Sequence, residues 1–180
     1  MGDSLITIVA IFLAAILMFV FPLMSISERN DDIAQLGIQT ATVEFVENIA
    51  STGKITLANY DSYIQSLVAT GNSYDVEMEI KVLDENPGKK TTWATTDKIG
   101  ENIYYSVYTS QILDVLAPED GTASTNYEYP LKEGDIVSIS VKNTNTTISQ
   151  MLRNFFYTVT GEDTYQVAAK HAAMVKSNGK

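Results

Sequence analysis

The sequence predicts an α+β protein in which a long N-terminal helix packs on a small antiparallel sheet. Three observations predict this fold class. A long uncharged apolar run stands near the N-terminus, helical periodicity follows directly after it, and later segments alternate apolar and polar residues as strands do. The elements are taken below in chain order.

The apolar run extends from Leu5 to Met24 and holds 20 residues without a charge. At a rise of about 1.5 Å per residue, a helix of this length spans roughly 30 Å, the hydrocarbon thickness of a bilayer. The run is longer than the core of a signal peptide, no Lys or Arg precedes it, and residues 25–27 lack the Ala-x-Ala cleavage pattern. We therefore expect a retained transmembrane anchor rather than a cleaved signal.

Small side chains in the anchor allow helices to approach one another closely. The predicted membrane and assembly helix is defined by Leu5, Ile8, Ala10, Ile11, Ala14, Ala15, Met18 and Pro22. From these residues alone, an ordinary anchor and a helix that packs against copies of itself both remain open.

The flank after the anchor indicates the orientation of the chain. This flank has four charged residues, Glu28, Arg29, Asp31 and Asp32, and only one of them is basic. The positive-inside rule therefore gives no reason to place the flank in the cytoplasm. We expect the N-terminus inside and the rest of the chain outside the cell membrane. The predicted organisation is a transmembrane anchor at 1–26, an extracytoplasmic domain at 27–175 and a flexible tail at 176–180.

Residues 27–52 show the period of an amphipathic helix. Apolar or small residues recur at spacings of three and four, at Ile33, Leu36, Thr40, Val43, Val46 and Ala50. We expect Ile33, Leu36, Val43 and Val46 to pack on the rest of the domain. Gly53 suits the left-handed residue that ends a helix. Because Pro22 is the last proline before it, the anchor and this helix are expected to form one rod, bent or loosened at Pro22.

A second helix is predicted from Thr56, a candidate N-cap, to Gly71. Strict alternation then predicts a strand at 74–83, and a turn at 86–88 leads to a possible partner strand at 91–96. Residues 103–116 fit both a strand and a helix, and we favour a helix that ends before Pro118. Residues 117–130 are expected to form a loop, 135–142 a strand, 148–156 a short apolar helix or plug, and 164–175 a final strand.

Composition excludes several functions. The net charge of −10 argues against nucleic-acid binding, which needs a clustered basic face. The chain has no cysteine, so disulfides and thiolate chemistry are absent. His171 is the single histidine, and a catalytic triad has no further candidates. We expect no catalytic residues, no cofactor and no metal site.

Other side chains have ordinary explanations. Glu77 and Glu79 fit the solvated face of a strand better than a metal site. The acidic pairs at 31–32 and 119–120 lack the spacing of a calcium loop. The tyrosines are numerous, and Tyr104, Tyr105, Tyr108, Tyr127 and Tyr129 are open to two interpretations: packing in the domain, or an adhesive or intersubunit surface.

The order of elements resembles the pilin architecture, and most closely the TadE-like minor pilins of tight-adherence pilus systems. The likeness covers the layout of the whole chain. Three stretches carry it: the uncharged span running into Thr42-Val43-Glu44-Phe45, the strand at 134–141, and the Ala-rich closing segment at 165–175.

The resemblance implies a non-enzymatic pilus or pseudopilus subunit, whose apolar helix serves as membrane anchor and then as filament core. It implies like or related pilin subunits, an assembly platform protein and its ATPase as partners. The alternative is a membrane-anchored extracytoplasmic binding or sensor domain. A secreted enzyme with a cleaved signal is a third class, disfavoured because catalytic candidates are lacking.

Overall fold

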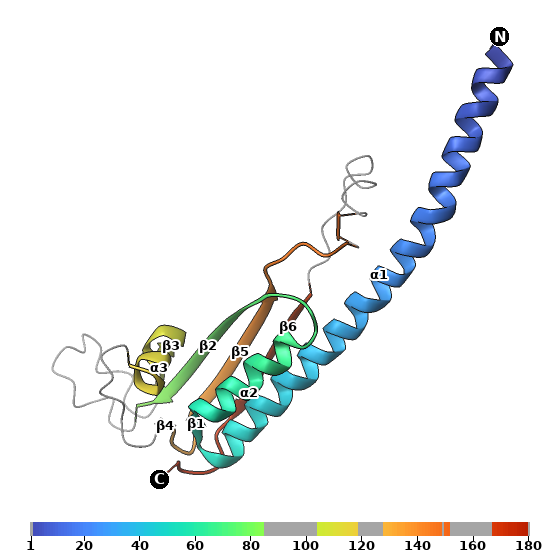
Figure 1. Ribbon diagram of the computed structural model, residues 1–180. Coiled ribbons are helices and arrows are strands. Elements are labelled where there is room, and N and C mark those ends of the chain that lie inside the picture. Colours follow the sequence, from blue (N-terminus) through green and yellow to red (C-terminus); the bar gives the residue numbers. More distant parts are fainter. Residues whose placement is uncertain (1, 85–103, 119–127, 149, 152–166, 180) are drawn as a thin grey trace, which may run out of the picture.

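The computed structural model describes residues 2–84, 104–118, 128–148, 150–151 and 167–179. A long N-terminal helix packs along a small two-layer head and projects far beyond it (Figure 1). The elements are α1 (Gly2–Thr52), β1 (Lys54–Thr56), α2 (Leu57–Val68), β2 (Tyr74–Leu83), β3 (Tyr104–Tyr108), α3 (Thr109–Leu116), β4 (Glu128–Pro130), β5 (Ile136–Asn143) and β6 (Ala168–Met174). This pilin-like arrangement confirms the predicted fold class.

The head is built on an antiparallel sheet with the strand order β3-β2-β5-β6. Alternation along β2 buries Met78 and Ile80 and exposes Asp75 and Glu77, as the sequence predicts. In β5 the residues Val137, Ile139 and Val141 are buried on the same face. One face of the sheet therefore belongs to the core, and the other is polar.

Helix α1 is unbroken and passes through Pro22. Its N-terminal part is long and apolar enough to cross a membrane, with a mean hydropathy of 2.9 over its most apolar window. No described side chain between Ser4 and Asn30 is buried, and Asp31 is the first buried residue. The helix ends where Gly53 adopts a φ of +70°, and the Gly53 N–H donates to the Ile49 carbonyl over 2.8 Å.

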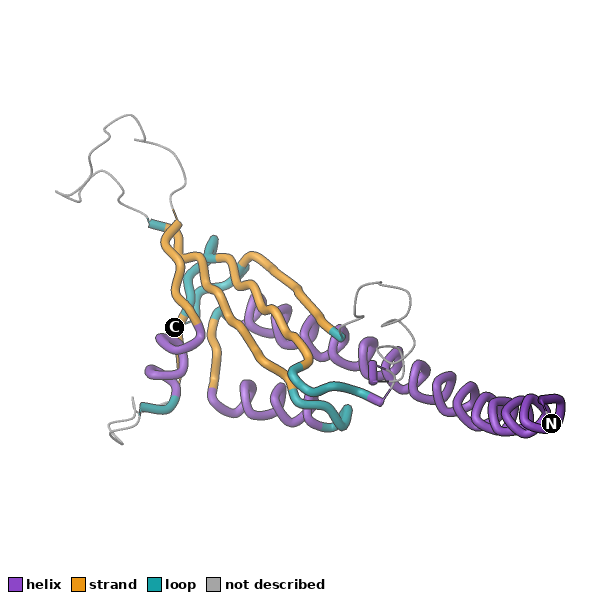
Figure 2. The backbone as a smooth tube through the Cα atoms, turned by 90° about the horizontal axis from the view of Figure 1, so that it is seen from above, coloured by secondary structure: helices purple, strands orange, loops and turns teal. Residues whose placement is uncertain are grey.

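The core lies between the sheet and the C-terminal half of α1. Buried α1 residues recur at helical spacing, at Ala34, Ile38, Phe45, Val46, Ile49 and Ala50. They meet the apolar face of β5 and the inner side chains of β6, Ala169 among them. Figure 2 shows α1 running beneath this side of the sheet.

The packing stripe expected on α1 is wrong in part. Ile33, Leu36 and Val43 are 69%, 66% and 40% exposed, and of the four expected residues Val46 is the buried one. The buried stripe lies on the opposite side of the helix, centred on Ile38 and Ile49. It is hard to recognise because it includes Asp31 and Thr42, both buried polar residues. The helix is thus apolar on two opposite faces.

Helix α2 packs beside α1 on the same face of the sheet. Thr56 caps it as predicted, since its hydroxyl accepts from the Asn59 N–H over 3.2 Å. The rings of Phe45 and Tyr63 stack with centroids 4.4 Å apart and an angle of 11° between their planes. This stacking joins the two helices.

Two further regions differ from expectation. Residues 103–116, where the sequence favours a helix, contain strand β3 before helix α3. The short strand β1 pairs with β4, and neither was predicted. Residues 86–88, 91–96 and 119–127, together with most of 148–156, lie outside the described part of the chain.

The C-terminal segment, predicted as a flexible tail, is held by hydrogen bonds. Lys176 N–H donates to the Ala50 carbonyl over 2.8 Å, and Gly179 N–H donates to the Leu131 carbonyl over 3.0 Å. The Asn178 side-chain oxygen accepts from the Glu133 N–H over 2.9 Å. This segment therefore lies against the end of α1.

Substitutions on the two faces of α1 should differ sharply in cost. Ile38→Ala removes a fully buried side chain, so we expect the free energy of unfolding to fall by about 2–5 kcal/mol. Leu36→Ala on the exposed face should stay within about 0.5 kcal/mol of the parent. Urea unfolding of the full chain in detergent micelles, followed by near-ultraviolet circular dichroism, measures both. Equal losses would contradict the assignment of the buried face.

Candidate functional site: the two faces of helix α1

The outer face of α1 carries a long stripe of mainly apolar residues, which Arg29 and Thr40 interrupt. In an α-helix, residues spaced alternately by three and four fall on one side. Counting from the N-terminus, the members of this outer stripe are Ile8, Ile11, Ala15, Met18, Pro22, Ile26, Ile33, Leu36, Thr40 and Val43. Arg29 is the one charged residue at this spacing. The stripe joins five predicted assembly residues to Ile33, Leu36 and Val43.

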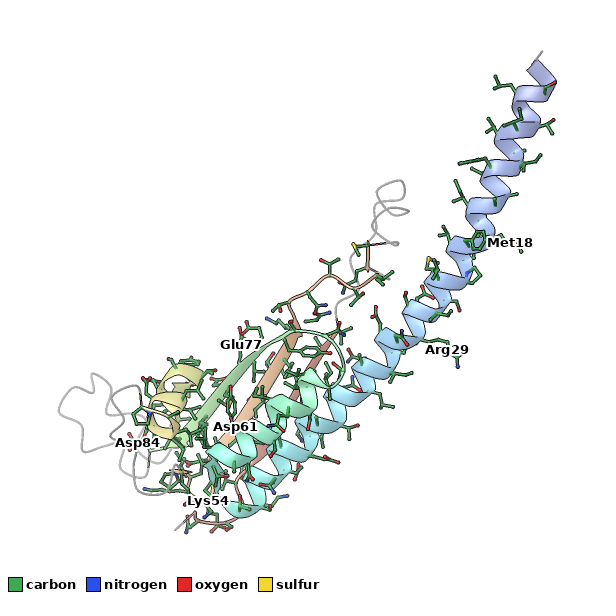
Figure 3. All side chains as sticks on the ribbon, in the orientation of Figure 1. Met18, Arg29, Lys54, Asp61, Glu77 and Asp84 are labelled. Atoms are coloured by element: carbon green, nitrogen blue, oxygen red, sulfur yellow. The ribbon has the colours of Figure 1, made fainter. Side chains whose placement is uncertain are left out.

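The stripe reaches well beyond the apolar run at residues 5–24. Ile33 and Val43 lie roughly 14 and 28 Å past Met24 along the helix axis. The hydrocarbon of a bilayer that contains residues 5–24 therefore cannot cover them. Figure 3 shows the side chains around Met18 radiating from a part of the helix that projects beyond the head. The remaining predicted assembly residues, Leu5, Ala10 and Ala14, are also exposed there.

The inner face of α1 is held to the head by polar contacts as well as by the core. Gln35 is the most specific of them. Its Nε2 donates to the Ala168 carbonyl over 2.6 Å, and its Oε1 accepts from the Ala168 N–H over 3.0 Å. The Gln35 amide thus makes both hydrogen bonds that a neighbouring strand would make to the backbone of Ala168 at the edge of β6.

A second contact lies nearer the end of the head from which the N-terminal half of α1 projects. The Thr147 hydroxyl donates to the Asp31 carboxylate over 2.9 Å, and both residues are buried. The Gln150 side chain accepts from the Thr147 N–H over 3.0 Å, which fixes the orientation of this segment. Because Asp31 is the first buried residue of α1, this contact marks the point where the helix enters the head.

A third contact joins α1 to α2. The Thr42 hydroxyl donates to the Ile38 carbonyl over 2.6 Å and lies 3.0 Å from the Tyr63 hydroxyl. Burial raises the pKa of Tyr63 to about 12, and the hydrogen bond with Thr42 opposes this effect in part. The phenol is therefore held in its neutral form.

A fourth contact is exposed and charged. The Glu47 carboxylate lies 3.3 Å from His171 Nε2 on β6 and 3.5 Å from Lys176 Nζ. The hydrogen bond with His171, followed by the charge of Lys176, lowers the pKa of Glu47. His171 thus contacts a helix carboxylate at the margin of the head. The four contacts, at residues 31, 35, 42 and 47, fix the rotation of α1 about its axis.

The strand glutamates and the tyrosines occupy different positions on the head. Glu77 is exposed on the polar face of the sheet, and Glu79 accepts from the Ser106 hydroxyl over 2.8 Å. In the described part of the chain, no group of three His, Asp or Glu side chains is placed to hold a metal ion. Tyr105 and Tyr108 are about half exposed, whereas Tyr129 is partly buried and its pKa is raised by that burial.

No protein-family model, curated protein or solved structure matches this chain. The functional interpretation therefore depends on the geometry of the two faces of α1.

Loss of the Gln35 side chain should loosen the contact between α1 and β6. In Gln35→Leu the edge groups of Ala168 lose both partners, so we expect the free energy of unfolding to fall by about 1–2 kcal/mol. Amide exchange of Ala168 should become faster. Gln39→Leu, an exposed change one turn later, is the matched control and should stay within about 0.5 kcal/mol. Unchanged Ala168 exchange in Gln35→Leu would argue against the contact.

The chain has 10 tyrosines, and Tyr63 should titrate apart from the exposed ones. Its pKa is raised from 10.0 to about 12 in the folded state, so its stabilising contribution is fully present below pH 10 and is lost as the pH rises through 12. The ultraviolet absorbance of tyrosinate should show a late step that Tyr63→Phe removes. Complete titration of the folded protein near pH 10 would contradict this.

Proposed function

We propose that the chain is a non-enzymatic structural subunit, a pilin or minor pilin, of a cell-surface pilus or pseudopilus. The N-terminal helix would hold the subunit in the cell membrane, with the head outside, and would then enter the core of a filament. The TadE-like proteins of tight-adherence systems are the family that this proposal follows. Like or related subunits, a platform protein and an assembly ATPase would be its partners.

The observation that carries the proposal is the outer stripe. A helix that served only as an anchor would need apolar residues within the bilayer alone. On this chain the stripe continues through Ile33, Leu36 and Val43, on the side of α1 turned away from its own head. Exposed apolar residues that continue past the membrane indicate a protein partner. A helix from another subunit fits both the shape and the length of this stripe.

The small residues of the span support the same proposal. Ala10, Ala14 and Ala15 permit neighbouring helices to approach, which favours packing in lipid as well as in a filament. The contacts at Gln35 and Asp31 keep the outer stripe facing outwards. Because the orientation of α1 on the head is fixed, every copy of the chain presents the same outer stripe. Repeated assembly requires an identical surface on each copy.

The alternative is a membrane-anchored extracytoplasmic binding domain that stays in the bilayer. One observation favours it: a groove of about 980 Å³ runs along β2 on the head. This alternative does not account for the outer stripe beyond the anchor. The two functions are therefore distinguished by substitutions in that stripe.

A charge placed on the stripe should prevent assembly without unfolding the head. Leu36→Glu alters an exposed side chain, so near-ultraviolet circular dichroism should be unchanged. In a filament the carboxylate would be buried without a partner, and we expect about tenfold or greater loss of the chain from sheared surface filaments. Mass spectrometry of the sheared and membrane fractions measures this loss.

Gln39→Glu is the matched control, since it adds the same charge to an exposed position outside the stripe. It should leave the amount in sheared filaments unchanged. If the parent chain with residues 5–24 intact is confined to the membrane fraction, the anchored binding domain is favoured instead. A mature N-terminus after Met24 would contradict both anchored functions.

A further inference from the structure

Strand β3 pairs with only half of β2. The register runs from Glu79, opposite Tyr108, to Leu83, opposite Tyr104. At Thr109 the chain leaves the sheet and begins α3. The first half of β2, residues 74–78, therefore has β5 on one side and no paired strand on the other within the described chain.

The register shows which backbone groups this open edge presents. Thr144 N–H donates to the Ser73 carbonyl over 2.9 Å, so odd-numbered residues of β2 direct their backbone groups towards β5. Even-numbered residues direct theirs to the opposite edge. At Met78 the Thr109 hydroxyl occupies that edge, accepting from the N–H over 2.7 Å and lying 3.3 Å from the carbonyl.

Val76 is the next residue on the open edge. Its N–H and carbonyl point away from β5, and no described residue takes them. Val76 is partly exposed, so solvent reaches this edge. The sheet thus has an open strand position beside residues 74–78 of β2, next to the position that β3 occupies.

A groove of about 980 Å³ follows this edge. Thr109, Ser110 and Leu113 form one wall, and the polar face of the sheet forms the other. Leu113 and Val76 are partly exposed and supply an apolar surface. The groove is therefore bounded in the way that an extended peptide would need.

Charge in the groove indicates which peptide would fit. Asp75 and Glu77 flank Val76, both are exposed, and neither carboxylate makes an ion pair or hydrogen bond with another described residue. Lys142 lies opposite Asp75 on β5, and Lys170 lies farther across the sheet. A strand added beside β2 would place alternate side chains next to Asp75 and Glu77, at roughly 5 Å between Cβ atoms.

We propose that the open edge of β2 at Val76 binds an extended segment of a partner protein as an added strand, with basic residues at alternate positions facing Asp75 and Glu77. Main-chain hydrogen bonds would supply the binding energy, and the two carboxylates would supply the selectivity. The inference does not depend on assembly into a filament. The opposite edge of the sheet fits less well, because Gln35 occupies it at Ala168.

The test uses the full ¹⁵N-labelled chain in detergent micelles. The probe is the peptide acetyl-Lys-Val-Lys-Val-Lys-amide, and acetyl-Glu-Val-Glu-Val-Glu-amide is its charge-reversed control. We expect the basic peptide to bind about tenfold more tightly, as two opposite-charge cross-strand pairs allow. Nuclear magnetic resonance should show shifts at residues 75–77 and 110, and amide exchange of Val76 should slow about tenfold or more at saturation.

Two variants separate strand addition from simple charge attraction. Val76→Pro removes the edge N–H and no hydrogen bond of the β2–β5 ladder, and should abolish binding. Asp75→Asn with Glu77→Gln changes exposed side chains only, and should reduce affinity about tenfold while the fold persists. Glu44→Gln with Asp61→Asn removes two exposed acids from the helices and should leave binding unchanged.

Several outcomes would overturn the proposal. One is equal binding of the acidic and basic peptides. Others are unchanged binding by a folded Val76→Pro variant, or binding that leaves Val76 exchange unaltered. Strong protection of the Val76 amide before any peptide is added would show that the edge is already occupied.

Discussion

The packing of the inner face of α1 on β5 and β6 is the constraint on which the rest of the structure depends. Ile38 and Ile49 supply the apolar contact, and both are fully buried. The hydrophobic effect alone does not specify one rotation of a helix, because it has little directional preference. The paired hydrogen bonds of Gln35 do have direction. Burial therefore holds the helix on the head, and the polar contacts select its angle.

The two sides of α1 have separate packing roles, which explains why both are apolar. The side with Ile38 completes the core of the head, and the side with Leu36 remains exposed. A helix with two apolar faces shows weak amphipathic contrast, because its apolar residues lie on opposite sides. The two faces have different partners, one within the chain and one proposed outside it. Neither can replace the other, since the polar contacts of Asp31, Gln35 and Thr42 occur on only one side.

The parts of the fold that were predicted are those with a local signal. Alternation along β2 identifies the strand and its buried face, and Thr56 and Gly53 mark helix ends through cap chemistry that acts over a few residues. The extent of the apolar run likewise predicts a helix able to span a membrane. These features depend little on the remainder of the chain.

The parts that were missed depend on distant contacts. The buried face of α1 includes Thr42, whose burial makes sense only beside Tyr63 of α2. Residues 103–116 carry tyrosines that satisfy both periods, and pairing with β2 decides in favour of a strand at 104–108. The contact of Gln35 with Ala168 joins residues 133 positions apart in sequence, so no local pattern predicts it. Sequence periodicity found two faces on α1 but could not say which one the head would take.

The hydrogen-bonded C-terminal segment has a consequence for the direction in which the molecule can be extended. Lys176 is fastened to Ala50 at the end of α1, and the two chain termini lie at opposite ends of the molecule (Figure 1). A protein module joined to the C-terminus would emerge from the tip of the head, farthest from the apolar end. The chain would therefore act as a spacer that holds an attached module at a distance from the surface that receives its N-terminal helix.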